Sequence, residues 1–217
     1  MPTIAILPVK SFGAAKQRLG GLVGAQARAV LARAMLTDVL AALARVPELA
    51  EVAVVTANPL AAELEAGGVT VLHDDREDGQ SAAAQIGIAH ALAGGYDRAL
   101  LVPGDTPLVE PAELSALVAR PEQVVIVPDR HGTGTNGLLL CPVDAIAPAF
   151  GPGSRARHEA AARAAGVTFA VDPLPSLVLD VDTPDDLEAT ARALERAPGG
   201  APATRDALRA LSLPAVP

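Results

Sequence analysis

Two lysines stand among 17 basic residues in this 217-residue chain, and both fall in Pro8-Val-Lys-Ser-Phe-Gly-Ala-Ala-Lys-Gln-Arg-Leu19. Lysine presents a compact ammonium charge, whereas arginine presents a broad planar fork. A loop that wraps phosphates can need the compact charge at specific positions. With Arg18, the lysines Lys10 and Lys16 place three cations within nine residues. This spacing suits a polyphosphate, and a solvated basic turn is the alternative interpretation.

Three aspartates are candidate metal ligands. Asp105 ends the run Leu100-Leu-Val-Pro-Gly-Asp105, and Asp180 and Asp182 stand in Leu177-Val-Leu-Asp-Val-Asp182. We expect the second run to be a strand, in which both carboxylates point to one face and repel each other unless a cation lies between them. Hard carboxylate oxygens suit Mg²⁺. The alternative is that Asp105 caps the turn that follows it, and that Asp182 or Thr183 caps the helix that begins at Pro184.

Two glycine-rich loops predict a separate anion site. Gly132-Thr-Gly-Thr-Asn-Gly137 includes Thr135, and Gly151-Pro-Gly-Ser154 stands before an expected helix. There Ser154 would cap the helix, and free N–H groups would bind an anion. Arg155 and Arg157 would add positive charge. A second anion site indicates a second phosphorylated substrate, and plain turns are the alternative interpretation.

Gln80 and Ser81 open another expected helix and are candidates to contact a nucleobase or ribose. Two standard nucleotide motifs are absent: no G-x-G-x-x-G follows the first apolar run, and no G-x-x-x-x-G-K-[ST] occurs. Their absence argues against a Rossmann dehydrogenase and a P-loop NTPase. The four histidines lack metal-ligand spacing, so zinc is not expected.

Apolar runs alternate with helical patterns along the chain. The expected strands are Ile4–Val9, Val52–Thr56, Val69–Leu72, Arg98–Val102, Val124–Val127, Gly137–Leu140 and Val167–Val171. The expected helices are Gln26–Leu43, Leu60–Ala66, Ser81–Ala93, Pro111–Val118, Arg157–Ala165 and Pro184–Leu194. This rhythm predicts a single α/β domain with three αβα layers around a mostly parallel sheet. Ligands bind beyond the carboxyl ends of such strands, where several of the polar loops begin.

Residues 1–197 form the expected domain, and residues 198–217 form a Pro/Gly linker and a tail. Within the tail, Thr204–Leu211 would form a short helix with Thr204 as its N-cap. Docking on the body, docking on a partner subunit and an untethered tail all remain open.

Composition excludes several classes of partner. A net charge of −8 argues against a nucleic-acid or membrane surface. No apolar run approaches the roughly 20 residues that span a bilayer, and no signal-peptide pattern follows Met1, so we expect a cytoplasmic protein. The single cysteine excludes an intramolecular disulfide. A homodimer is compatible with the sequence, although no clear apolar patch predicts one.

Taken together, six motifs resemble those of the guanylyltransferases of coenzyme F420 biosynthesis, in order and in spacing, from Ile4 to about Arg196. The motifs are Pro8-Val-Lys10, Ala15-Lys-Gln-Arg-Leu19, Gly104-Asp-Thr-Pro107, Gly134-Thr-Asn-Gly137, Gly151-Pro-Gly-Ser154 and Asp180-Val-Asp-Thr-Pro184. The resemblance implies a GT-A-like nucleotidyltransferase fold. It also implies transfer of GMP from GTP to a phosphorylated three-carbon acid with release of pyrophosphate, and a downstream transferase of the same pathway as a partner.

The resemblance also implies roles for individual residues. Asp105, Asp180 and Asp182 would bind Mg²⁺, and Thr135, Gly151 and Ser154 would bind the phospho-acid. The Lys10–Lys16 loop with Pro8 would cover the GTP phosphates, where Lys10, Lys16 and Arg18 stabilise developing charge. Phosphoenolpyruvate is the first choice of acid, with 2-phospho-L-lactate and 3-phosphoglycerate as alternatives. One departure is Ser81, where the family pattern has Asn.

Three rival functions fit parts of the sequence. A molybdopterin-type nucleotidyltransferase normally opens with a glycine-rich L-x-G-G loop, but Leu7-Pro-Val-Lys10 stands there. A non-catalytic nucleotide-binding regulator would tolerate loss of the metal aspartates, yet three candidates are present. A sugar-nucleotide glycosyltransferase usually carries its D-x-D after a central strand, whereas Asp180-Val-Asp182 lies near the end of the chain.

Overall fold

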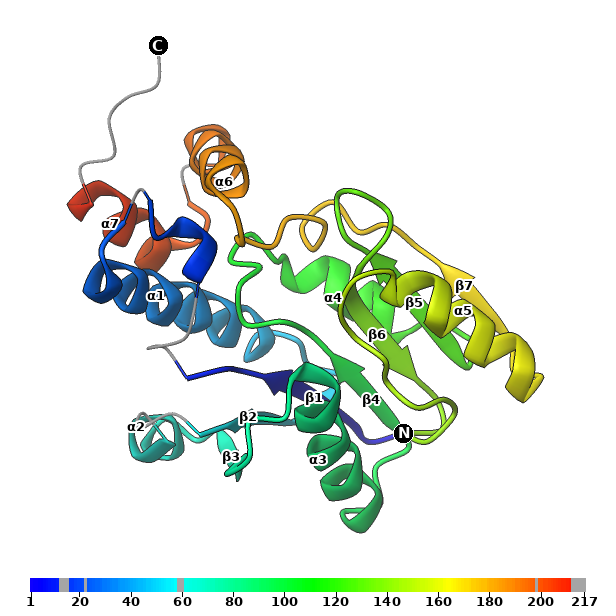
Figure 1. The fold of residues 1–217 in the computed structure, drawn as a ribbon. Coiled ribbons are helices and arrows are strands. Elements are labelled where there is room, and N and C mark those ends of the chain that lie inside the picture. The colour runs from blue at the N-terminus through cyan, green and yellow to red at the C-terminus, as the bar shows by residue number, and fades with distance from the viewer. Residues whose placement is uncertain (12–15, 22, 58–60, 198, 212–217) are drawn as a thin grey trace.

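The computed structural model describes residues 1–11, 16–21, 23–57, 61–197 and 199–211. Ala15 of the second motif, Leu60 of an expected helix and residue 198 of the linker lie outside these ranges. Within the described ranges, seven strands form one sheet in the order β3-β2-β1-β4-β6-β5-β7 (Figure 1). The strands are β1 (Thr3–Pro8), β2 (Leu49–Thr56), β3 (Thr70–His73), β4 (Arg98–Leu101), β5 (Val124–Pro128), β6 (Thr135–Leu140) and β7 (Phe169–Val171).

The sheet is mostly parallel, as the sequence predicts. Strand β6 pairs antiparallel with both β4 and β5, whereas the other four pairings are parallel. Strand β1 shows why the sheet is covered on both faces: Ala5 and Leu7 pack into one core cluster, and Ile4 and Ile6 pack into another. Because successive strand residues point to opposite faces, a fully apolar strand must be buried on both sides.

Helices cover the two faces and confirm the three αβα layers. They are α1 (Ala25–Leu43), α2 (Ala61–Ala66), α3 (Gln80–Ala93), α4 (Pro111–Val118), α5 (Ser154–Ala165), α6 (Pro184–Arg196) and α7 (Pro202–Ala210). Helices α1 and α4 contribute to the cluster around Leu7, and α3 and α5 contribute to the cluster around Ile6. A short 3₁₀ turn, Gln17–Leu19, precedes α1. Among the described residues, none of the helices combines the length and apolarity needed to cross a membrane.

The expected strand over 177–182 is wrong. The described chain is irregular there and does not pair with a strand. Val181 N donates to Asp105 O at 3.1 Å, beyond the end of β4, and Leu177 O accepts from the side chain of Asn136 in β6 at 2.9 Å. Leu177 and Val181 are fully buried, so this apolar run reports burial rather than a strand. The segment ends at Thr183, which caps α6 in a reciprocal capping box with Asp186.

Helix α7 docks on the body against α1 (Figure 1). It begins at Pro202 with Ala201 as its N-cap, so the prediction that Thr204 caps it is wrong. The Asp38 carboxylate from α1 instead accepts hydrogen bonds from Ala203 N at 3.1 Å and Thr204 N at 2.7 Å. A small third core follows from this docking, made of Leu19, Val23, Leu31, Ala32, Met35, Val181, Leu187 and Ala207. Leu19, close to Lys16, and Val181, next to Asp182, both belong to this third core, so it holds these two segments together.

Candidate active site

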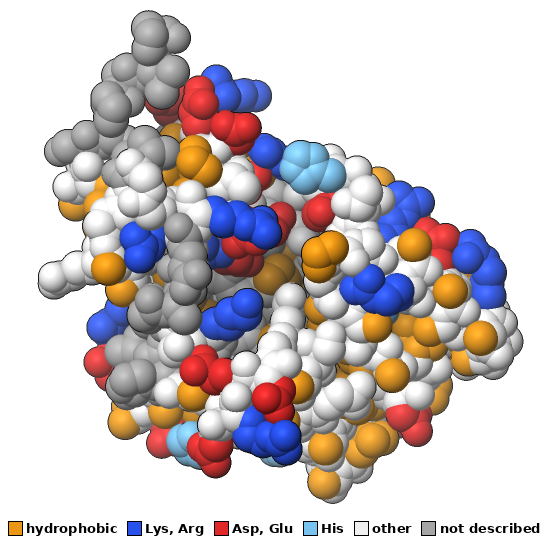
Figure 2. All heavy atoms as spheres, viewed as in Figure 1, with side chains coloured by type: hydrophobic (Ala, Val, Ile, Leu, Met, Phe, Trp, Pro, Cys, Tyr) orange, Lys and Arg blue, Asp and Glu red, His pale blue; other side chains and the backbone are white. Residues whose placement is uncertain are grey.

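A cleft of about 750 Å³ opens at the edge of the sheet where β1 and β4 end. Figure 2 shows acidic and basic side chains gathered around this hollow. Eleven of the twelve predicted site residues line it: Pro8, Lys10, Lys16, Arg18, Gln80, Asp105, Thr135, Gly151, Ser154, Asp180 and Asp182. The topology therefore brings together segments that are up to 174 positions apart in the sequence, as the distance from Pro8 to Asp182 shows.

Strand β6 contributes through its beginning rather than its end. Because β6 runs antiparallel to β4, its first residues lie at the same sheet edge as the carboxyl end of β4. The pairing with β5 shifts register there: Val127 faces Gly137 and Pro128 faces Thr135, which leaves Asn136 as an extra residue. Such a bulge re-aims side chains, and here the successive residues Thr135 and Asn136 both line the cleft.

On the side of the cleft that we call the aspartate side, Lys16 joins two of the three aspartates. Its Nζ donates to Asp105 Oδ2, and to Asp182 Oδ1 at 3.0 Å. Burial opposes the charge of Lys16, but the carboxylates of Asp105 and Asp182 outweigh it and raise the lysine pKa. Burial likewise opposes ionisation of Asp182, and Lys16 outweighs it and lowers that pKa. Both groups are therefore charged at neutral pH.

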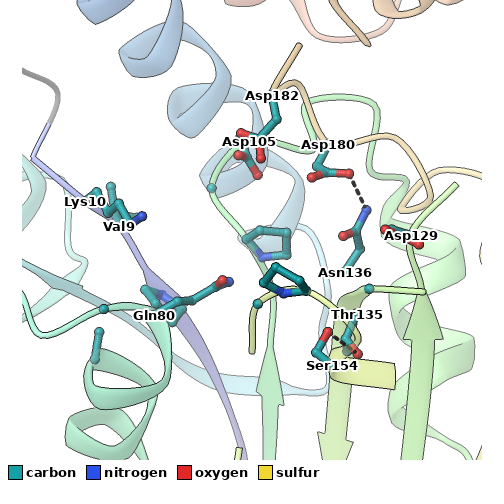
Figure 3. Close-up of a pocket in the computed structure, with 18 of the residues that line it drawn as sticks. Val9, Lys10, Gln80, Asp105, Asp129, Thr135, Asn136, Ser154, Asp180 and Asp182 are labelled. Atoms are coloured by element: carbon teal, nitrogen blue, oxygen red, sulfur yellow. Dashed lines mark hydrogen bonds between the residues drawn. The ribbon is translucent and has the colours of Figure 1, made fainter. Parts of the chain in front are cut away.

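Asp180 is held differently. Burial, with the nearby charge of Asp105, raises the pKa of Asp180 to about 6, against a hydrogen bond from Asn136 that lowers it. Asn136 Nδ2 donates to Asp180 Oδ1 at 3.1 Å and to Leu177 O at 2.9 Å (Figure 3). Asn136 thus fixes both the carboxylate and the chain that leads to it.

The donor set of the aspartate side fits a divalent cation. Asp105 Oδ1 is buried and has no hydrogen-bond partner among the described residues, and an unpaired buried carboxylate oxygen is costly without a cation. Asp105, Asp180 and Asp182 lie around one end of the cleft (Figure 3). No three carboxylate, histidine or cysteine side chains of the described chain form a ready-made ligand cluster. Mg²⁺ commonly uses one or two carboxylates together with substrate phosphates, so a complete protein cage is not required.

The other side of the cleft, which we call the hydroxyl side, consists of β6 and the start of α5. Ser154 Oγ donates to Thr135 Oγ1 at 3.2 Å, and both residues are buried. Gly153 is the N-cap of α5 and supplies no side-chain cap, so the prediction that Ser154 caps the helix is wrong. Gly151 and Gly153 have φ angles of 102° and 70°, which residues with a Cβ rarely adopt. Gly151, Gly153 and Ser154 line the cleft, so the positive end of α5 opens onto it.

Arg155 and Arg157, which were expected to add positive charge to this side, bond groups of their own helix and of nearby loops. Neither is among the described residues that line the cleft. The guanidinium of Arg155 bonds Glu159 and Gly132 O, at 2.9 and 3.1 Å. That of Arg157 bonds the backbone carbonyls of residues 149–152 and so braces the glycine-rich turn. The position of Arg157 in the sequence does not reveal that its guanidinium bonds the backbone of the turn.

Of the two residues predicted to contact the nucleobase or ribose, Gln80 lines the cleft and Ser81 does not. Gln80 lines the cleft at the start of α3 (Figure 3). Ser81 is not among the lining residues, and its Oγ accepts a hydrogen bond from Phe150 N at 2.9 Å. Ser81 therefore ties α3 to the turn before α5.

Sequence reasoning missed three contributors. Asp129 lines the cleft and shapes its loop by accepting a hydrogen bond from Thr133 N at 2.9 Å. Asn136 stands in the same loop as Thr135, but the sequence does not indicate that it holds Asp180. His158 is fully buried beneath Thr135, and its position four residues after Ser154, on the same helix face, was the available signal.

Comparison with known proteins gives a consistent family match. The family model described as "Guanylyl transferase CofC like" matches residues 3–194. A protein of Conexibacter woesei named phosphoenolpyruvate guanylyltransferase is 49% identical over 97% of this chain and 97% of its own length. A protein of Mycobacterium leprae with the same name is 38% identical over 86% of this chain and 87% of its own.

Solved structures show the same fold at low identity. A protein of Desulfovibrio desulfuricans described as a nucleotide-diphospho-sugar transferase matches with a TM-score of 0.76 at 22% identity, over 97% of both chains. A Mycobacterium tuberculosis protein solved with manganese matches with a TM-score of 0.56 at 16% identity, over 87% of this chain and 97% of that one.

Proposed function

We propose that this chain, which belongs to the CofC-like guanylyl transferase family, transfers GMP from GTP to phosphoenolpyruvate. The products are enolpyruvyl-diphosphoguanosine and pyrophosphate, within coenzyme F420 biosynthesis. One observation carries this proposal: a single cleft has a charged aspartate side and a separate hydroxyl side at a helix N-terminus. Two anionic substrates can therefore lie next to each other, which the reaction requires.

The chemistry needs little proton transfer. A phosphate oxygen of the acceptor attacks the α-phosphorus of GTP, the bond from that phosphorus to the bridging oxygen breaks, and pyrophosphate leaves with the electron pair. The acceptor phosphate is already an anionic nucleophile, so no strong general base is required. Catalysis is then mostly positioning and charge stabilisation.

The residues divide into two groups by role. Lys10 and Arg18 are exposed at the cleft and would contact the GTP phosphates, with Lys16 deeper between the aspartates. Thr135, Gly151 and Ser154 would hold the phospho-acid. Gln80, at the cleft edge, would contact the nucleobase or ribose.

Asp105, Asp180 and Asp182 would hold Mg²⁺ together with the substrate phosphates. The bound ion would neutralise charge on those phosphates. The manganese complex of a protein with the same fold supports a divalent ion here. We also propose that the enzyme acts in the cytoplasm. The next enzyme of the pathway would be a transferase that consumes the reactive diphosphate product. A homodimer stays a prediction.

The test is an acceptor scan. The protein is incubated with GTP, Mg²⁺ and pyrophosphatase plus phosphoenolpyruvate, 2-phospho-L-lactate or 3-phosphoglycerate, and phosphate release is measured. We expect release with phosphoenolpyruvate. Release with another acid alone would keep the guanylyl transfer and correct the acceptor. No release with any acid, even with the downstream transferase present, would overturn the proposal.

A further inference from the structure

The buried histidine of α5 takes no part in the reaction as described so far. His158 is fully buried, and both of its ring nitrogens are hydrogen-bonded. We propose that His158 is a positioning residue that makes the hydroxyl pair of Thr135 and Ser154 a hydrogen-bond donor to the acceptor anion. This inference deepens the proposed function, because it rests on that function for the identity of the anion.

The protonation of the ring follows from one backbone group. Ala149 N–H lies 2.8 Å from His158 Nε2, and an amide can only donate, so Nε2 must accept. In a neutral ring the proton then sits on Nδ1. Burial, with the charge of Arg157, lowers the pKa of His158 to about 4, which keeps the ring neutral at physiological pH. His158 Nδ1–H therefore donates to Thr135 Oγ1, at 3.0 Å.

One hydroxyl hydrogen of the Thr135–Ser154 pair is left without a protein acceptor in the described chain. Thr135 and Ser154 carry two hydroxyl hydrogens, and one lies in the 3.2 Å hydrogen bond between their oxygens. His158 cannot accept the other, because its Nδ1 already bears hydrogen. In the described part of the chain no other protein acceptor takes it. Both residues line the cleft, so the remaining O–H is directed at a ligand there.

The opposite tautomer would reverse the polarity of the site. If Nε2 carried the proton, Nδ1 would accept the hydrogen of Thr135, and Ser154 would donate to Thr135. Both hydroxyl protons would then be used inside the protein, and only lone pairs would face the cleft. Lone pairs repel a phosphate or carboxylate, so the orientation of Ala149 N–H decides whether the hydroxyl side attracts an anion.

The chain around Ala149 is braced from several directions. Arg157 Nε and Nη2 donate to Ala149 O at 3.1 and 2.9 Å, and Nη2 also reaches Phe150 O at 2.9 Å. Ser81 Oγ accepts from Phe150 N at 2.9 Å. The Phe150 ring meets the His158 ring edge-on, with centroids 5.3 Å apart. These contacts fix the direction of Ala149 N–H and thereby the tautomer.

Two substitutions separate the functions of the two ring nitrogens. In His158→Gln the amide oxygen can still accept from Ala149 N–H, but the donor to Thr135 is lost. In His158→Asn the amide nitrogen can replace the Nδ1 donor, but the acceptor for Ala149 is lost. We expect His158→Gln to raise the KM for phosphoenolpyruvate about tenfold with little change in kcat or in the KM for GTP. We expect His158→Asn to keep that KM near the wild-type value while lowering the Tm.

Nitrogen-15 NMR of the histidine rings in the substrate-free protein tests the tautomer directly. We expect Nδ1–H for His158 from pH 6 to pH 8; finding Nε2–H would overturn the proposal whatever the activity.

Binding of inorganic phosphate tests the anion site without turnover, and it is measured from the amide chemical shifts of Gly151 and Ser154. Weaker phosphate binding in His158→Gln but not in His158→Asn is expected. Equal losses in both variants, following their Tm, would reduce His158 to a structural residue. A wild type that binds phosphate with the expected tautomer but releases no pyrophosphate would refute only the proposed function.

Discussion

On the hydroxyl side of the cleft, Thr135 is hydrogen-bonded to both Ser154 and the ring of His158. On the aspartate side, by contrast, Asp105 keeps a buried oxygen without a partner in the described chain. The hydroxyl side lies on β6 and α5. On the aspartate side, Asp105 follows β4, and Asp180 and Asp182 stand in irregular chain before α6. Asn136 connects the two sides, next to Thr135 and bonded to Asp180.

The difference indicates that the hydroxyl side is arranged by hydrogen bonds before a ligand binds, whereas the aspartate side still needs positive charge. Neutral hydrogen bonds can be completed before a ligand binds, and they set a fixed geometry at low cost. Three carboxylates cannot be neutralised by Lys16 alone, so the aspartate side is stabilised fully only when more positive charge arrives. We therefore expect changes on the aspartate side to affect kcat and metal response, and changes on the hydroxyl side to affect acceptor KM.

Asp105→Asn is expected to have the largest effect. It leaves the shape of the side chain but removes the charge that faces the cation and the phosphates, and we expect kcat to fall about 1,000-fold or more. Pyrophosphate release measures it, with circular dichroism to confirm folding. Asp144→Asn, at an exposed position outside the cleft, is the matched control. Wild-type turnover in Asp105→Asn would refute the metal assignment.

Lys16→Met tests whether a cation is needed between Asp105 and Asp182. Without the ammonium the two carboxylates repel each other, so we expect the Tm in EDTA to fall by about 5 °C and to recover when Mg²⁺ is added. We also expect kcat to fall about 100-fold. Lys10→Met is the stability control, because Lys10 is exposed, bonds neither aspartate and lowers the pKa of Asp182 less than Lys16 and Arg18 do. If Mg²⁺ did not restore the Tm of Lys16→Met, the ammonium and the metal would not neutralise the same carboxylates.

Ser154→Ala addresses the hydroxyl side. Removing Oγ leaves the His158 ring and the helix end in place, so we expect the KM for phosphoenolpyruvate to rise about tenfold and the KM for GTP to change less. Initial rates with each substrate varied in turn measure both constants. Ser115→Ala, whose hydroxyl bonds Glu48 away from the cleft, is the control. A larger rise in the KM for GTP would mean that the two substrate sites are exchanged.

Much of the fold was predictable because it depends on apolar periodicity. Strand β1 and helices α3 and α4 were located within one residue of their observed ends, since buried runs and Pro or Gly boundaries are local signals. The strand prediction for Leu177 to Asp182 is wrong because a buried apolar segment has the same sequence pattern whether or not it pairs with a sheet. The predicted start of α5 is three residues late, because glycines precede the helix and its first turn carries serine and two arginines, which give little apolar signal.

The candidate site was predictable where polar residues follow strands. Lys10 and Asp105 needed only that rule. The glycine-rich loop was enough to predict Thr135 as a site residue. The antiparallel direction of β6 and the extra residue at Asn136 depend on long-range strand pairing, which the sequence does not show. His158 acts through groups 9 and 23 positions away, a relation that spacing alone does not reveal.

Asp180→Asn gives the smallest change and the sharpest test of the unneutralised aspartate side. The folded-state pKa of Asp180, about 6, lies above its ordinary value of 3.8, so its contribution to stability is present below about pH 3.8 and is lost as the pH rises through about 6. A neutral amide keeps the hydrogen bond from Asn136 and removes the buried charge. We expect Asp180→Asn in EDTA to raise the Tm by about 3 °C at pH 8, with the gain vanishing near pH 4. Thermal melts at both pH values measure it, and Mg²⁺ should stabilise the wild type more than the variant. A Tm at pH 8 no higher than that of the wild type would show that the aspartate side is already neutralised, which would remove the contrast between the two sides of the cleft.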